Sequence, residues 1–185
     1  MTGTENLRAM QRRVVTVNNA QGKSEILIDG SAAAVFSPSG GEGMYEVWSE
    51  TVLGQIALGP IVDAASGPVR LSAPKNGVLA RWFIVEPRPD NLTEEELRAM
   101  TKAMAAELGG ADMQPDTSRH YGMHLTPTLD FSIVLSGRIK LILDTTETIL
   151  EPGSVVVQRA TNHAWEAMDG LPAMILAVLI DRSAE

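Results

Sequence analysis

A run of short β-type segments separated by turn residues is the feature of this sequence that most restricts its fold. Beyond residue 119, apolar β-prone stretches alternate with Ser-Gly, Pro-Gly and Asp-Gly dipeptides, which are typical of tight turns. The segments are residues 129–135, 138–143, 146–150, 154–159, 163–168 and 172–180. Strands this short and this evenly spaced are typical of a closed barrel or a jelly roll. We therefore predict an antiparallel β-barrel in the C-terminal third of the chain.

The N-terminal part carries weaker strand signals. Residues 13–17 and 25–28 are β-type runs on either side of turn-forming residues 18–22, which predicts a hairpin. Residues 44–48 and 78–85 predict two further strands. We find no repeat of the C-terminal pattern here, so a second barrel is not expected.

A helix is predicted over residues 93–108. Thr93 is a favourable N-cap, Glu96 completes a capping box, and Gly109 begins a C-terminal stop signal. The apolar stripe of this helix consists of Leu97, Met100, Met104 and Leu108. We expect the helix to cover an apolar face of the barrel.

These signals divide the chain into two parts. Residues 1–110 are expected to supply N-terminal strands and one helix that pack on the barrel or on a partner subunit. Residues 111–185 are expected to form the barrel core. The N-terminal part is not expected to be an independent domain.

The composition excludes several classes of function. With 15 Lys and Arg against 23 Asp and Glu, the formal charge is −8, so no nucleic-acid or anionic-membrane partner is expected. The absence of cysteine excludes disulfides, thiolate metal ligands and a cysteine nucleophile. The apolar run at residues 171–180 is roughly half as long as a membrane helix requires, and the N-terminus lacks the apolar segment of a secretory signal. We therefore expect a cytoplasmic protein whose partner is a small molecule.

All the histidines lie in the predicted barrel, and they are His120, His124 and His163. Because side chains alternate between the two faces of a strand, the even-numbered positions from 120 to 130 share one face if the chain stays extended. That arrangement puts Asp130 on the same face as His124. In the next histidine-bearing strand, His163 shares a face with Trp165.

At these positions the sequence resembles the cupin superfamily. The first motif of that family has two histidines as HxH, then a glutamate, then a glycine seven residues after it. The residues at the matching positions here are His124, Thr126, Asp130 and Gly137. The second motif ends in Gly-x-x-His, and here Ala160 replaces the glycine while His163 supplies the histidine. The resemblance covers about a third of the chain.

The resemblance implies a mainly β fold, an antiparallel double-stranded β-helix or jelly-roll barrel with an N-terminal β extension and one α-helix. In cupins the motif residues bind one divalent metal ion inside the barrel. The site implied here is His124, Asp130 and His163, as metal ligands and catalytic residues, with Fe, Mn, Ni or Zn as the ion. The substrate pocket is expected to include Thr126, Trp165 and Tyr121. His120 is not expected as a further ligand, because four residues along a strand span about 13 Å.

A metal-free reading of the same residues remains open. Asp130 is one methylene shorter than the glutamate of the motif, and Thr126 is a poor ligand in place of a histidine. The histidines could instead form hydrogen bonds in a metal-free pocket, with Asp130 orienting an imidazole.

Three function hypotheses follow. The first is an enzyme of the lyase, isomerase or dioxygenase type that acts on a small carbonyl, carboxylate or phenolic compound by decarboxylation, isomerisation, dehydration or oxygenation. The second is a metal-free cupin that binds a small molecule without catalysis. The third is a purely structural assembly protein. We also expect a homodimer, because the edge strands of a small barrel need cover, which residues 25–28 and 44–48 could supply.

Overall fold

The computed structural model describes residue 7 and residues 11–18, 21, 23–38, 42–51 and 63–182. The N-terminal strands are β1 (Arg13–Asn18), β2 (Ser24–Gly30), β3 (Val35–Phe36), β4 (Met44–Glu50) and β5 (Val78–Val85). A 3-10 turn, η2 (Ala64–Ser66), precedes β5, and helix α2 (Glu94–Glu107) follows it. The remaining strands are β6 (Thr128–Ser136), β7 (Ile139–Leu143), β8 (Glu147–Leu150), β9 (Val155–Arg159), β10 (His163–Ala167) and β11 (Ala173–Asp181).

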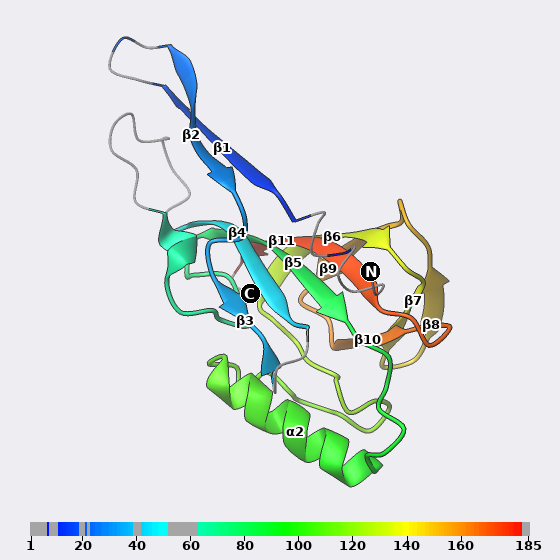
Figure 1. The fold of residues 1–185 in the computed structure, drawn as a ribbon. Coiled ribbons are helices and arrows are strands. Elements are labelled where there is room, and N and C mark those ends of the chain that lie inside the picture. Colours follow the sequence, from blue (N-terminus) through cyan, green and yellow to red (C-terminus); the bar gives the residue numbers. More distant parts are fainter. Residues whose placement is uncertain are drawn as a thin grey trace.

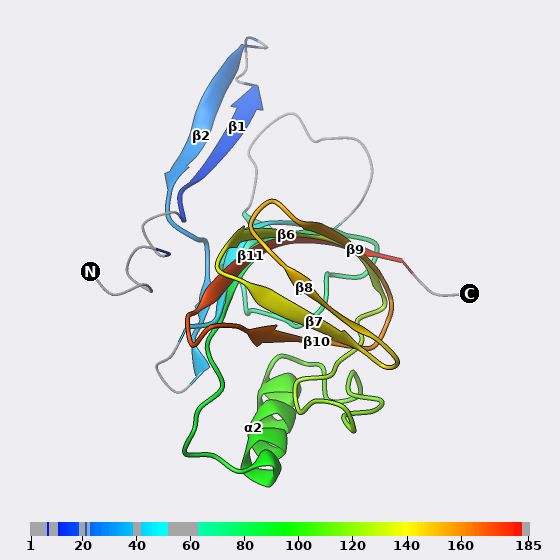
Figure 2. The same cartoon turned by 90° about the vertical axis from the view of Figure 1, so that its right-hand side faces the viewer.

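The strands form three antiparallel sheets within the described residues. The large sheet has the order β3-β4-β5-β11-β6-β9, the small sheet has the order β10-β7-β8, and β1 and β2 pair separately. Figure 2 shows the small sheet lying across from the large one, so that the two enclose a barrel. Apolar side chains from both sheets meet between them in a cluster of Val134, Ile139, Ala173 and Ile175. This is the mainly β, antiparallel barrel with one helix and an N-terminal strand pair that the sequence predicts.

Burial follows the alternation expected along β6. Asp130, Ser132 and Val134 are buried, whereas Phe131 between them is exposed. The turn into β7 needs Gly137, which has φ +76° and leaves no room for a Cβ beside the backbone of Pro172 and Ala173. The predicted strands from residue 129 onward are all present.

Strands from both sides of the expected division at residue 110 share one sheet. β5 pairs along its length with β11, Val85 opposite Ala173 and Val78 opposite Ile180. β4 pairs with β5 in turn and places Glu46 opposite Arg81. The N-terminal strands β3, β4 and β5 are therefore part of the barrel wall.

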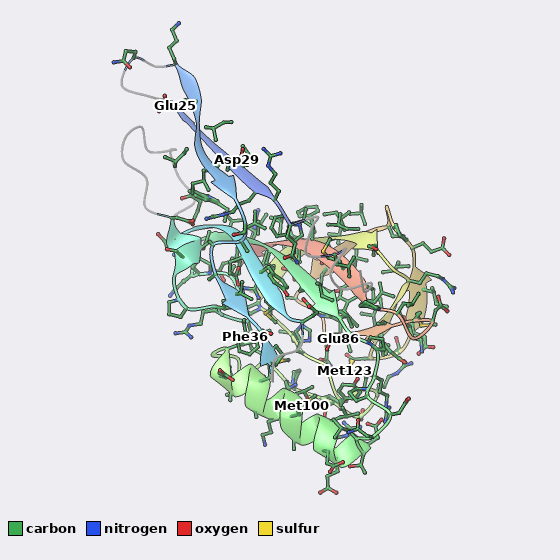
Figure 3. All side chains as sticks on the ribbon, viewed as in Figure 1. Glu25, Asp29, Phe36, Glu86, Met100 and Met123 are labelled. Atoms are coloured by element: carbon green, nitrogen blue, oxygen red, sulfur yellow. The ribbon has the colours of Figure 1, made fainter. Side chains whose placement is uncertain are left out.

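Helix α2 begins at the predicted cap. Thr93 and Glu96 form both hydrogen bonds of the capping box, and Gly109 has φ +73° at the C-terminal end. Ala105 and Leu108 pack on Leu71 and on side chains at the ends of β3 and β4, including Phe36, which lies beside the helix in Figure 3. The helix thus covers one end of the barrel (Figure 1).

The predicted apolar stripe of this helix is wrong at one position. Met100 is 44% exposed, while Leu97, Thr101 and Ala105 are buried. The face against the barrel therefore runs through Thr101, whose hydroxyl lies within hydrogen-bond distance of the carbonyl oxygens of Leu97 and Tyr121. The small threonine lets the helix lie close to the chain segment that precedes β6.

The predicted hairpin of β1 and β2 is present, and it projects from the barrel (Figures 1 and 2). Residues 19, 20 and 22 of its predicted turn lie outside the described residues. At its base the Arg13 guanidinium donates to the carbonyl oxygens of Ser31 and Val47 and to the Asp63 carboxylate. Among the described residues, no helix has the length and apolarity that crossing a membrane requires.

Candidate functional site

A cavity of about 280 Å³ lies inside the barrel at the end covered by helix α2. Its walls come from β4, β5, β6, β10 and β11, and Thr101, Met104 and Ala105 of the helix complete them. Five of the predicted site and pocket residues line it, and they are His124, Thr126, Asp130, His163 and Trp165. The structure therefore brings residues that are far apart in the sequence into one space.

Two of these residues form a close imidazole pair. His124 precedes β6 and His163 begins β10, and their backbones form an isolated antiparallel bridge with two N–H to O hydrogen bonds of 2.9 Å. The ring centroids lie 4.4 Å apart with an angle of 46° between the planes. The bridge fixes the spacing of the two side chains, since both project from the same paired position.

Both imidazoles are held in the same tautomer. Nδ1 of His124 lies 2.9 Å from the carbonyl oxygen of Gly122, and Nδ1 of His163 lies 2.9 Å from that of Thr161. A carbonyl oxygen only accepts, so each Nδ1 carries the proton and donates it to the backbone. In the neutral ring the other nitrogen, Nε2, then has a free lone pair.

Burial keeps both rings neutral. It lowers the pKa of His124, and it lowers the pKa of His163 to about 3, with the neighbouring His124 adding to the effect. At neutral pH the cavity therefore holds two imidazoles that can accept a hydrogen bond or bind a cation.

Asp130 shows the opposite response to burial. It is 6% exposed, and its Oδ1 has no hydrogen-bond partner within the part of the chain that the structure describes. Burial raises its pKa to about 6, although a hydrogen bond with Thr128 and the charge of Arg81 act against this. A carboxyl group with this pKa can give or take a proton near neutral pH.

Arg81 is a charged residue of the cavity that the sequence reasoning missed. It is 3% exposed, lines the cavity from β5, and forms an ion pair of 2.9 Å with Glu46 of β4. The signal for it was present in the sequence, because Arg81 is the lone charge in the apolar run of residues 78–85. A charge in the middle of a buried strand needs a partner or a function.

Aromatic rings form part of the wall. The Trp165 ring lies 5.8 Å from the His163 ring at 83°, and 6.2 Å from the ring of Phe83 on β5. Both Trp165 and Phe83 line the cavity. They give it an apolar surface beside the imidazole pair.

Tyr121 was expected in the pocket, but the structure places it outside the cavity lining. Its ring stacks on that of His120 at a centroid distance of 4.1 Å, and the Arg88 guanidinium lies 5.8 Å from its centre. The reason is local, because residues 120–123 form a turn closed by the Met123 N–H to His120 O hydrogen bond. Strand alternation therefore does not hold before His124.

The three predicted ligands do not come together around one point. The described residues contain no group of three or more His, Asp or Glu side chains that could hold a metal ion. The two imidazoles do fit as a pair of neighbouring ligands, because each donates its second nitrogen to a backbone carbonyl, as metal-binding histidines usually do. Asp130, whose pKa responds to Thr128 and Arg81, does not complete this set.

Comparison with known proteins gives local sequence matches. No protein-family model matches the chain. A cupin-domain-containing oxidoreductase, virC of Hypocrea virens, is 44% identical over 63 residues, which are 32% of this chain and 32% of that protein. Phomopsin biosynthesis cluster protein C' of Diaporthe leptostromiformis is 52% identical over 44 residues, 23% of each chain. The match thus spans a third or less of these curated relatives.

Among solved structures, one similar protein is a Cupin 2 conserved barrel domain protein from Salinispora arenicola. The two share 13% sequence identity with a TM-score of 0.42, over 80% of this chain and 82% of the other.

Proposed function

We propose that this chain, which has the cupin fold, is an enzyme of the oxidoreductase type that acts on a small, largely apolar, oxygenated compound. The observation that carries the proposal is the pair of neutral imidazoles lining the barrel cavity, each with Nδ1 hydrogen-bonded to a backbone carbonyl, which leaves the lone pair on Nε2. The oxidoreductase names of partial relatives support this type over the lyase and isomerase types.

The residues of the cavity divide the work between binding and proton transfer. Phe83 and Trp165 bind the apolar body of the substrate, and α2 excludes water from one end. Asp130 takes up or releases a proton at its carboxyl group, since its pKa of about 6 lies near neutral pH.

His124 and His163 are the residues that would hold a divalent ion. When bound, an Fe, Mn, Ni or Zn ion would polarise an oxygen atom of the substrate. With two protein nitrogens as ligands, most coordination positions would remain for water or substrate.

The test is metal binding by untagged protein. We expect one Fe(II) or Mn(II) per chain, and we expect His163→Ala to weaken binding at least about 100-fold, since even indirect partners of a ligand contribute 10- to 100-fold. His120→Ala is the matched control, because His120 lies outside the cavity lining and should leave metal binding unchanged.

A second candidate function is a metal-free barrel that binds a small molecule without catalysis. It is favoured by the lack of a third ligand beside the two imidazoles within the described residues. Wild-type protein that binds none of these ions at millimolar concentration would contradict the metal-dependent proposal and support this candidate.

A further inference from the structure

The cavity is lined by a buried arginine, Arg81, whose guanidinium is incompletely hydrogen-bonded within the described residues. Arg81 Nη2 donates to the Arg70 carbonyl and lies 2.9 Å from a carboxylate oxygen of Glu46, an ion pair in which neither Glu46 oxygen accepts a hydrogen bond from the described residues. Nη1 donates to the sulfur of Met44, a weak acceptor, at 3.0 Å. Nε is buried and has no hydrogen-bond partner among the described residues. A strong acceptor on a ligand would favourably replace the weak sulfur contact of Nη1.

Small side chains leave space beside this guanidinium. Across the large sheet, Arg81 of β5 stands opposite Ala177 of β11, and Ala177 stands opposite Ser132 of β6. All three residues line the cavity. The cross-strand neighbours of Arg81 therefore have short side chains, which leave room for a ligand group beside the guanidinium.

Two carboxyl groups near Arg81 can change their charge when an anion binds. Burial raises the pKa of Glu46 to about 7 and that of Asp130 to about 6, so each can take up a proton near neutral pH. Uptake of one proton would offset the charge of a bound monoanion, whereas a dianion would require both carboxyl groups to be protonated.

We propose that Arg81 binds the carboxylate of the substrate, so that the cavity selects small monocarboxylates with an apolar or aromatic body. The aromatic side chains Phe83 and Trp165 receive the apolar body, and the imidazole pair lies beside it. This inference rests on the proposed function, because it takes the cavity to be the substrate site. It adds the class of substrate, a small monocarboxylate.

The test compares two probes of nearly equal shape, benzoate and benzamide, on protein freed of metal with a chelator. We expect calorimetry at neutral pH to give benzoate an affinity about tenfold or more above that of benzamide, since a hydrogen bond between two charged groups is stronger than one to a neutral amide. The variant Arg81→Gln should lose this preference. The control Arg13→Gln removes a buried arginine that pairs with Asp63 away from the cavity lining, and it should keep the preference.

If Arg81→Gln does not fold, a second variant tests whether Arg81 binds the carboxylate. Glu46→Gln removes the competing carboxylate, so benzoate affinity should rise several-fold while benzamide affinity stays unchanged. The proposal is overturned if the wild type binds benzamide as well as benzoate, binds neither at millimolar concentration, or if Glu46→Gln weakens benzoate.

The outcome is independent of the metal test. A chelated protein that prefers benzoate through Arg81 but never binds metal contradicts the metal-dependent proposal alone. Metal binding that depends on His163, without any benzoate preference, contradicts the carboxylate inference alone.

Discussion

At the scale of single residues, burial acts in opposite directions on the acids and bases of the cavity. It lowers the pKa of His163 to about 3 and raises the pKa of Asp130 to about 6 and of Glu46 to about 7. The cause is shared, because a low-dielectric environment disfavours whichever form is charged. Near neutral pH the imidazoles are therefore free bases, while the carboxyl groups exchange protons.

The raised pKa of Glu46 makes the stability of the protein depend on pH. Its pKa is raised from 4.5 in an unfolded chain to about 7 in the folded one, so the stabilising protonated form is lost as the pH rises between these values. We expect the Glu46→Gln variant to become more stable relative to the wild type as the pH rises across this range. The shift should be on the order of 3 kcal/mol, measured by urea unfolding at several pH values. A difference that stays constant, or that moves toward the wild type, would show that the ion pair with Arg81 dominates instead.

At the scale of elements, helix α2 acts as the cover of the cavity. Thr101, Met104 and Ala105 line the cavity, while Leu108 anchors the end of the helix against Leu71. A short amphipathic helix gains most of its stability from such packing rather than from its own hydrogen bonds.

The anchor can be tested with a pair of substitutions on this helix. Leu108→Ala should lower the free energy of unfolding by about 2–5 kcal/mol, because Leu108 is buried in the cluster with Leu71 and Ala105. Met100→Ala should change it by less than about 0.5 kcal/mol, because that side chain is 44% exposed. Equal effects in urea unfolding would mean that the helix is placed differently.

At the scale of the whole molecule, the barrel depends on strands from both ends of the chain. β5 lies between β4 and β11 in the large sheet, and β11 is the last strand. Removing the C-terminal part would expose the edge of β5 and the apolar side chains that face the cavity.

We therefore expect a fragment of residues 1–110 to be unfolded or aggregated when expressed alone. Heating should give no cooperative transition by circular dichroism, whereas the full chain should give one. A cooperative melt from the fragment would show that the N-terminal strands form an independent unit.

We also propose a homodimer, for which the exposed apolar side chains are the support. Ile26 and Leu27 are exposed on the projecting hairpin, and Val155 and Val157 are exposed on the edge strand β9. Residues 44–48, which the sequence suggested as cover, lie in β4 and are already paired with β5. Light scattering at micromolar concentration should give a dimer mass, which Ile26→Asp should reduce and Leu171→Asp, an exposed turn position, should not. A monomer mass for the wild type would contradict the proposal.

The sequence by itself determined the capped helix, the inward face of β6 and all the described strands except the short β3, Val35–Phe36. Period-2 alternation and turn residues act between near neighbours, so the burial of Asp130 and the positive φ of Gly137 could be inferred from local pattern alone. The resemblance to the cupin motifs predicted that His124 and His163 share one cavity, and the structure places both in its lining.

Only the tertiary structure decided which side chains complete that cavity. The pairing of Arg81 with Glu46 depends on the register of β4 against β5, and the separation of Asp130 from the imidazole pair depends on how two sheets face each other. The outward position of Met100 depends in the same way on how α2 packs, whereas the turn that removes Tyr121 is local and is closed between His120 and Met123. Register and packing arise from contacts between residues far apart in the chain, and a local pattern carries no information about them.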